Sequence, residues 1–229
     1  MNQNETPLLL AIDTSTDICS IVISNENKIF IHYLINIKRL HDKLLAEITR
    51  RALNDMDISL SSIDAVAISS GPGSFTGLRI GASFAKALCI DESPKLISVP
   101  TLFAYSVAAE EFAHLLNFNK IHALITANSG IVYHQIFDSN SQKISEPEML
   151  QMKDVISNLA LINNQNHNNE LFIGNALLSI ENSNFVKYSE LNFMDAIKIS
   201  KAGWRLFNQH SFIDPSTFEP EYIQDFLPK

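Results

Sequence analysis

The first third of the chain alternates short apolar runs with polar turns, which is typical of strands joined in a meander. We predict strands at 8–13, 18–24 and 29–35, the last two separated by a polar cluster at 25–28. Residues 39–54 then change to helical spacing. A buried strand is predicted at 64–69, and a glycine-containing turn at 71–77 leads into a helix that ends near residue 90.

The second half repeats this mixture of strands and helices. We predict helices at 101–114, 153–161 and 194–209, strands at 121–127, 131–137 and 171–174, a hairpin turn at 128–130, an asparagine-rich loop at 163–169 and a mostly irregular tail. The pattern indicates an α/β fold with helices on the faces of the sheets. The restarted strand pattern indicates a second subdomain of related design.

Composition narrows the range of functions. The chain has 229 residues with a net charge of −8 and 46% hydrophobic residues, so we expect a globular protein that binds nucleic acid poorly alone. Cys19 and Cys89 lie in apolar runs and are expected to be small buried hydrophobes. No two histidines stand at HxxxH spacing, so no metal site is expected. With neither a signal peptide nor an apolar run of about 18 residues, we expect a cytoplasmic protein without a membrane span.

Two segments carry candidate chemistry. Asp13, Thr14, Ser15 and Thr16 follow the first strand and can hold a phosphate and a magnesium ion, or can simply form a polar turn, which we favour because no glycine lies among them. The loop at 71–77 includes Gly71, Gly73 and Ser74. Its spacing matches neither a P-loop, nor a dinucleotide fingerprint, nor a nucleophile elbow, which leaves a strand-to-helix turn with free amides.

The helix after this loop has apolar residues around most of its circumference, so both of its sides should be buried. Two interpretations of this helix are equally open, a helix of the chain's own core and a helix at a partner interface. Gly77 and Gly81 would let a neighbouring helix approach closely. Together with the 39–54 helix it provides these candidate interface residues: Leu40, His41, Leu44, Leu45, Ile48, Gly77, Arg79, Gly81, Ala82, Ser83, Ala85 and Lys86.

Five segments together resemble the TsaB (YeaZ) family. They are 11–16, 19–20, His41 early in a helix, 71–81 with its Gly-Pro-Gly-Ser-Phe-Thr-Gly-Leu-Arg core, and 99–102. The resemblance implies an actin/Hsp70/sugar-kinase-like fold of two RNase H-like subdomains. The first would comprise residues 1–110, with 194–229 packing back on it, and the second 111–193. The chain departs from the family at 126–128, which reads Thr-Ala-Asn instead of Asp-Ala-Arg, and at Gln224, where the family has arginine.

The resemblance further implies a function without catalytic or metal-binding residues. Family members activate TsaD, which transfers a threonylcarbamoyl group to N6 of the tRNA adenosine 3′ of the anticodon, and they work with the ATPase TsaE. Asp13–Thr16, Gly71, Gly73 and Ser74 would then be a vestigial phosphate loop, and the two helices would contact TsaD or a second copy of the chain. Contact with tRNA would come only through the complex. Weak binding of ATP or ADP, or binding of a nucleotide shared across the interface, stays open. Two alternatives remain: a nucleotide-dependent enzyme of the sugar-kinase-like fold and a glycoprotease-like peptidase.

Overall fold

A computed structural model describes residues 6–37, 40–90, 94–127, 130–155, 157, 170–179 and 189–221. The chain divides into two compact units, the first of Met1–Thr101 with Asp195–Glu221 and the second of Leu102–Met194 with Tyr222–Lys229. The division falls at residue 101, whereas the expected boundary at residue 110 lies inside a helix. Residues 128–129, most of the predicted 153–161 helix, the 163–169 loop and the 222–224 motif lie outside the described residues.

The first unit is built on a five-stranded sheet, called sheet A. Its strands are β1 (Leu9–Asp13), β2 (Cys19–Ser24), β3 (Ile29–Ile35), β4 (Ala65–Gly71) and β5 (Lys95–Pro100), in the order β3-β2-β1-β4-β5. The first three are antiparallel, which confirms the predicted meander, and β4 and β5 run parallel to β1. The sequence did not predict β5, because Pro94 and Pro100 bound the short run and read as breaks.

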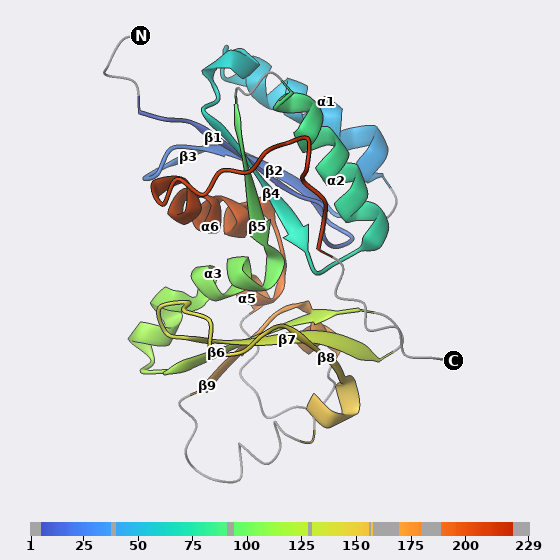
Figure 1. The fold of residues 1–229 in the computed structure, drawn as a ribbon, viewed down its shortest axis with the longest axis vertical. Helices are drawn as coiled ribbons and strands as arrows, with labels where there is room; N and C mark the ends of the chain where they lie inside the picture. Colours follow the sequence, from blue (N-terminus) through green and yellow to red (C-terminus); the bar gives the residue numbers. More distant parts are fainter. Residues whose placement is uncertain are drawn as a thin grey trace. The chain divides into compact units, whose positions relative to one another are not determined.

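Helices cover both faces of sheet A (Figure 1). α1 (His41–Asp55) and α2 (Phe75–Leu88) lie on one face, α6 (Ala196–Asn208) lies on the other, and the short η1 (Leu60–Ser62) precedes β4. Every residue of β1 and β4 is therefore buried, as their uniformly apolar runs predict. Cys19 and Cys89 are also buried, and this burial raises the pKa of each thiol to about 12. Their interpretation as small buried hydrophobes is confirmed.

Hydroxyl groups fix α6 to β2 although the two elements are far apart in the sequence. The indole Nε1 of Trp204 donates to Ser24 Oγ at 2.9 Å, and Ser24 Oγ lies 2.8 Å from Ser200 Oγ. At the start of the helix, the Ala196 amide donates to Ser20 Oγ at 2.8 Å. The chain that follows α6 therefore stays within the first unit.

The second unit contains a four-stranded sheet, called sheet B. Its strands are β6 (Lys120–Thr126), β7 (Ile131–Asp138), β8 (Glu148–Gln151) and β9 (Glu170–Ile173), in the order β8-β7-β6-β9. The predicted β6–β7 hairpin is confirmed, and β9 runs parallel to β6. The sequence did not predict β8, which has four residues with polar ends and therefore gives little periodic signal.

The second unit includes the helices α3 (Thr101–Leu115), η2 (Asn175–Ser179) and α5 (Ser189–Asn192), and residues 152–155 and 157 are also helical. α3 lies along one face of sheet B (Figure 1), where Phe103 approaches Phe137 with ring centroids 6.4 Å apart. The other face carries a small apolar cluster of Leu124, Val132, Val155, Ala176 and Leu177. Over the described ranges, none of the helices combines the length and the apolar character needed to cross a membrane.

Candidate functional site

The carboxyl ends of β1, β4 and β5 meet at one edge of sheet A because these strands are parallel. Asp13 is the last residue of β1, Ser70 and Gly71 end β4, and Thr101 follows β5. This edge of an open α/β sheet is the usual place for a ligand. The fold therefore brings the two candidate segments, 13–16 and 71–77, to the same edge.

Asp13 is fully buried and only half satisfied. Its Oδ1 accepts hydrogen bonds from the Ser15 amide at 3.1 Å and the Ser15 hydroxyl at 2.7 Å. Burial raises the pKa of the Asp13 carboxyl above its ordinary value, although the hydrogen bonds from Ser15 oppose the shift. The Asx turn favoured by the sequence is thus confirmed, with an ionisable group held in an apolar sheet.

Four buried polar atoms around this edge find no hydrogen-bond partner among the described residues. They are Asp13 Oδ2, Thr14 Oγ1, Ser70 Oγ and Thr101 Oγ1. Such groups are uncommon in folded proteins and call for a specific explanation. One carboxylate with several hydroxyls suits a water-coordinated Mg²⁺ and a phosphate better than a closed protein cage. The described residues contain no group of three His, Cys, Asp or Glu side chains able to hold a metal.

The glycines of the 71–77 loop are explained by close packing within the chain. A Cβ on Gly73 would lie 2.5 Å from the Ser15 carbonyl oxygen, which also accepts the Ser74 amide at 2.7 Å. Ser74 caps α2 by accepting the Gly77 amide at 3.2 Å. The open side of Gly73 is therefore occupied by backbone of the 13–16 segment, and the loop and this segment form one packed unit.

The C-terminal segment closes the other side of the loop. Gly71 has a φ of +115°, and a Cβ there would lie 2.5 Å from the Glu221 carbonyl oxygen. The Glu221 amide donates to the Ser70 carbonyl oxygen at 2.7 Å. Lys86, a predicted interface residue, holds the same segment through hydrogen bonds from Nζ to the carbonyl oxygens of Phe218 at 3.0 Å and Ser216 at 3.4 Å.

The predicted groove at Gly77 and Gly81 is wrong. A Cβ on Gly77 would lie 2.0 Å from the Thr14 carbonyl oxygen, and one on Gly81 would lie 2.3 Å from Thr14 Oγ1, so this chain fills the space itself. Ala82 and Ala85 are buried on the same inner side. In α1 the corresponding inner positions are His41, Leu45 and Ile48. The pattern misled because glycine and alanine count as apolar, yet here they serve close packing against the sheet.

Comparisons with known proteins decide the family. The family model described as TsaD, tRNA N6-adenosine threonylcarbamoyltransferase, matches residues 30–190. The TsaB protein of Haemophilus influenzae, a "tRNA threonylcarbamoyladenosine biosynthesis protein", is 32% identical over 150 residues, 65% of this chain and 61% of that protein. Escherichia coli TsaB is 35% identical over 101 residues, 44% of this chain and 43% of that protein. The chain belongs to the TsaB (YeaZ) branch of the TsaD family.

Solved structures agree with this placement at the level of the fold. YeaZ from Pseudomonas aeruginosa superposes with a TM-score of 0.72 at 20% identity, over 95% of this chain and all of that chain. A second Pseudomonas protein, described as similar to peptidase YEAZ, gives 0.76 at 19% identity, over 96% and 100%. The predicted α/β fold is confirmed, and the chain shares it with YeaZ. The matched segments span less than two thirds of the length of either TsaB relative above.

The side of α1 and α2 that faces away from sheet A is the candidate surface for binding a partner. We call it the α1–α2 surface, formed by Leu40, Leu44, Phe75, Arg79, Ile80, Ser83 and Phe84. Leu44 is partly buried, Ile80 and Phe84 are partly buried and pack against the core of the first unit, and Arg79 and Ser83 are exposed. The Arg79 guanidinium lies 5.0 Å from the centre of the Phe75 ring. The surface thus has apolar side chains bordered by polar ones.

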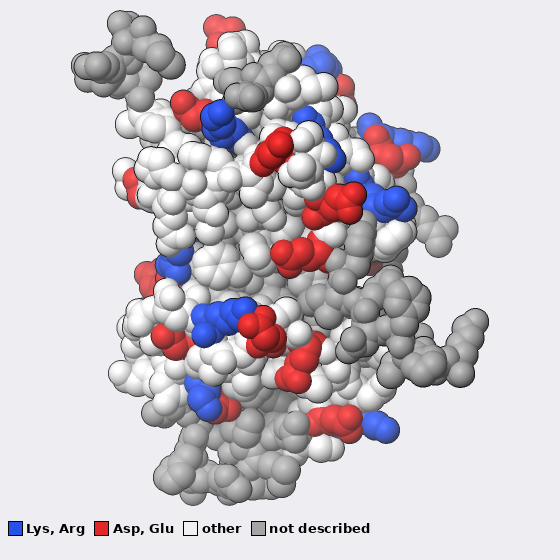
Figure 2. All heavy atoms as spheres, viewed as in Figure 1, with Lys and Arg blue, Asp and Glu red and all other residues white. Residues whose placement is uncertain are grey.

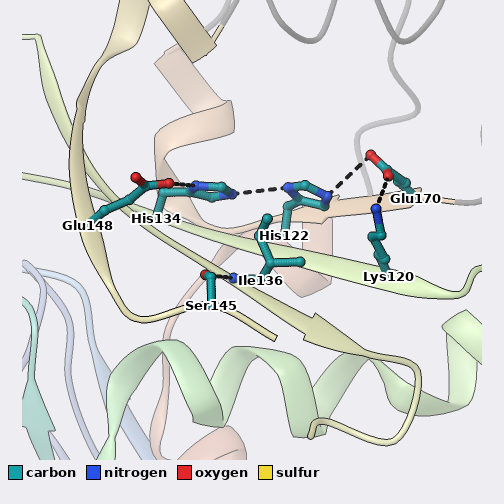
Figure 3. A network of polar contacts seen from close by, with 7 residues as sticks. All are labelled: Lys120, His122, His134, Ile136, Ser145, Glu148 and Glu170. Carbon is teal, nitrogen blue, oxygen red and sulfur yellow. Dashed lines mark hydrogen bonds and ion pairs between the residues drawn. The ribbon is translucent and has the colours of Figure 1, made fainter. Parts of the chain in front are cut away.

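A second polar cluster lies in sheet B and was not predicted. His122 Nδ1 and His134 Nε2 are 3.0 Å apart, and both side chains are buried (Figure 3). In the hairpin register Leu124 is opposite His134 and His122 is opposite Ile136, so the two histidines are diagonal neighbours on one face. The available signal was the hairpin turn itself, since it places residues twelve apart in the sequence side by side.

Proposed function

We propose that this chain is a non-catalytic activating subunit in tRNA threonylcarbamoyladenosine biosynthesis, pairing with TsaD during threonylcarbamoyl transfer to tRNA. The observation that carries the proposal is the double match, to the TsaD family over residues 30–190 and to proteins named TsaB. Two chains built on one fold can pair through equivalent surfaces about a pseudo-two-fold axis. The same surface would serve for a homodimer of the isolated chain.

The packing around the 71–77 loop supports an activating role over turnover of a nucleotide. Gly73 and Gly77 are in contact with the backbone of Ser15 and Thr14, and Gly71 with that of Glu221. A phosphate approaching any of these glycines from the side of the missing Cβ would have to displace backbone of the same chain. The loop therefore works as a structural joint between β1, β4 and α2.

The α1–α2 surface is the contact that we assign to TsaD. Leu44 and Phe84 supply the apolar centre, and exposed charges at Asp42, Lys43 and Arg79 supply a rim that sets orientation and partner choice.

Contact with tRNA is assigned to the complex. Figure 2 shows acidic and basic side chains interspersed over the drawn face, and the chain carries 25 acidic against 17 basic residues. TsaE is assigned as a further partner on the family resemblance alone.

A reconstituted reaction tests the proposal. Purified TsaD, threonylcarbamoyl adenylate and unmodified tRNA are combined with or without this chain, and the modified nucleoside is quantified. We expect the wild-type chain to stimulate product formation and to elute with TsaD in size-exclusion chromatography. Ser83→Glu and Leu44→Glu should reduce both. Ser61→Glu places the same charge on an exposed serine outside the two helices and should retain both. Equal stimulation by all four proteins would refute the assigned surface, and no stimulation by the wild type would refute the function.

A nucleotide-dependent enzyme is the second candidate, because one specific observation favours it. Asp13 Oδ2 is buried and has no hydrogen-bond partner among the described residues, at the sheet edge where ligands bind. Titration calorimetry with Mg²⁺ and ATP distinguishes the candidates. Micromolar binding by the isolated wild-type chain, lost in Asp13→Asn, with measurable phosphate release would support the enzyme. The activating-subunit proposal expects no phosphate release by the chain alone.

A further inference from the structure

Five side chains on one face of sheet B form a continuous polar chain (Figure 3). Glu148 Oε1 on β8 lies 3.0 Å from His134 Nδ1, and Glu170 Oε2 on β9 lies 3.2 Å from His122 Nε2. Lys120 Nζ completes the chain 2.9 Å from Glu170 Oε1. The two histidines lie on the central strands, β6 and β7, and the two carboxylates lie on the outer strands. The row of polar side chains therefore crosses the whole sheet.

Counting protons shows that the chain of contacts is one proton short. There are three gaps to bridge: between Glu148 and His134, between the two histidines, and between His122 and Glu170. Two neutral imidazoles carry two N–H groups, so one of the three gaps always lacks a donor, either at a carboxylate or between the two rings. The contact between His122 Nε2 and Glu170 Oε2, at 3.2 Å, is the longest of the three.

A third proton fills every gap, and a fourth cannot fit. With three protons the pair is a single imidazolium shared between two rings, and each gap contains one N–H donor. With four, two N–H groups would oppose each other across the 3.0 Å that separates His122 Nδ1 from His134 Nε2. The charges give the same answer. Glu148, Glu170 and Lys120 have a net charge of −1 when all three are ionised, and one added proton cancels it.

The surroundings support a single added proton. Burial, followed by the neighbouring charge of His134, lowers the pKa of His122 to about 4. Phe172 stacks on His122 with ring centroids 4.3 Å apart, which excludes water from one side. Asp138 shares this face, opposite Lys120 in the hairpin register. Before β8, Lys143 pairs with Glu146. Beyond Phe172 the face continues as the apolar cluster around Leu124.

We propose that His122 and His134 act as one unit that takes up a single proton, and that this proton completes an unbroken run of hydrogen bonds from Glu148 on β8 to Glu170 on β9. When the proton leaves, one of the three hydrogen bonds is lost, either the one to a carboxylate or the one between the two rings. The pair is thus a proton-dependent link across sheet B of the second unit. It acts independently of the proposed function.

Glutamine variants provide a sharp test because their side-chain amide can donate the missing hydrogen bond. In Glu170→Gln the amide donates to His122 Nε2, so both rings become Nδ1–H tautomers. In Glu148→Gln the amide donates to His134 Nδ1, so both rings become Nε2–H tautomers. Glu146→Gln, an exposed neighbour outside the polar chain, is the matched control. Long-range ¹H–¹⁵N spectra of histidine-labelled full-length protein report the tautomer and the charge of each ring.

We expect the wild-type pair to take up one proton in total between pH 8 and pH 5, and the two variants to lock opposite tautomers. The control should match the wild type throughout. Two protons taken up above pH 5, or tautomers that do not change in either variant, would overturn the proposal. So would stoichiometric Zn²⁺ bound to both histidines at pH 7.

Discussion

Gly77 of α2 and Thr14 of the segment after β1 are packed backbone to backbone. A Cβ on Gly77 would stand 2.0 Å from the Thr14 carbonyl oxygen, closer than any real contact allows. The glycine at position 77 is therefore required for α2 to pack this closely against the end of β1. This contact joins the two candidate segments through their main chains.

We expect Gly77→Ala to destabilise the first unit by about 3 kcal/mol or more, because the added methyl must push Thr14 and Ser15 away from the helix. Ser83→Ala, at an exposed position of the same helix, should change the free energy of unfolding by less than about 0.5 kcal/mol. Urea denaturation of both variants measures the difference. Equal stabilities of the two would show that α2 can shift at no cost.

Charges placed on α2 should separate its inner and outer sides. Arg at Ala85, which is fully buried, should unfold the chain or lower its stability by several kcal/mol, since an unpaired charge enters the core. Arg at Ser83 should leave the fold intact and change only partner binding. Circular dichroism with thermal melting gives the comparison. A stable Ala85→Arg protein would mean that the inner side of α2 faces solvent after all.

The sequence predicted sheet A better than it predicted the site. Uniform apolar runs such as Leu8–Asp13 permit only a covered strand, so β1, β2 and β4 were readable. Runs bounded by proline or only four residues long, such as β5 and β8, were not. Residue type also could not show whether the space beside a glycine is filled by the same chain, so Gly77 and Gly81 were interpreted as a place where a neighbouring helix could approach. The histidine pair depends on hairpin register, which no local spacing of His122 or His134 reveals.

Asp13→Asn should stabilise the folded chain at pH 7. Burial raises the pKa of Asp13, so the folded state disfavours the charged carboxylate, and this cost grows as the pH rises above the ordinary value of 3.8. Removing the charge should raise the free energy of unfolding at pH 7, with the gain shrinking toward pH 4. Chemical denaturation at pH 4, 5.5 and 7 tests this. A variant that is less stable at pH 7 would contradict it.

The stability of the second unit should fall in mild acid. The pKa of His122 is lowered to about 4 in the folded protein, whereas an unfolded histidine titrates near 6.5. Between these values the unfolded chain binds one more proton, so stability is lost as the pH falls, at up to about 1.4 kcal/mol per pH unit. His122→Gln should flatten this slope. Unchanged slopes in the variant would assign the acid sensitivity to other groups.

The level of threonylcarbamoyladenosine in tRNA tests the central claim most directly. In the native host, depletion of this chain should remove the modified nucleoside from bulk tRNA, as measured by mass spectrometry of nuclease digests. The wild-type gene and the Ser61→Glu variant should restore it, and Ser83→Glu should not, provided that all three proteins are present at equal levels. An unchanged amount of the nucleoside after complete depletion would contradict the account.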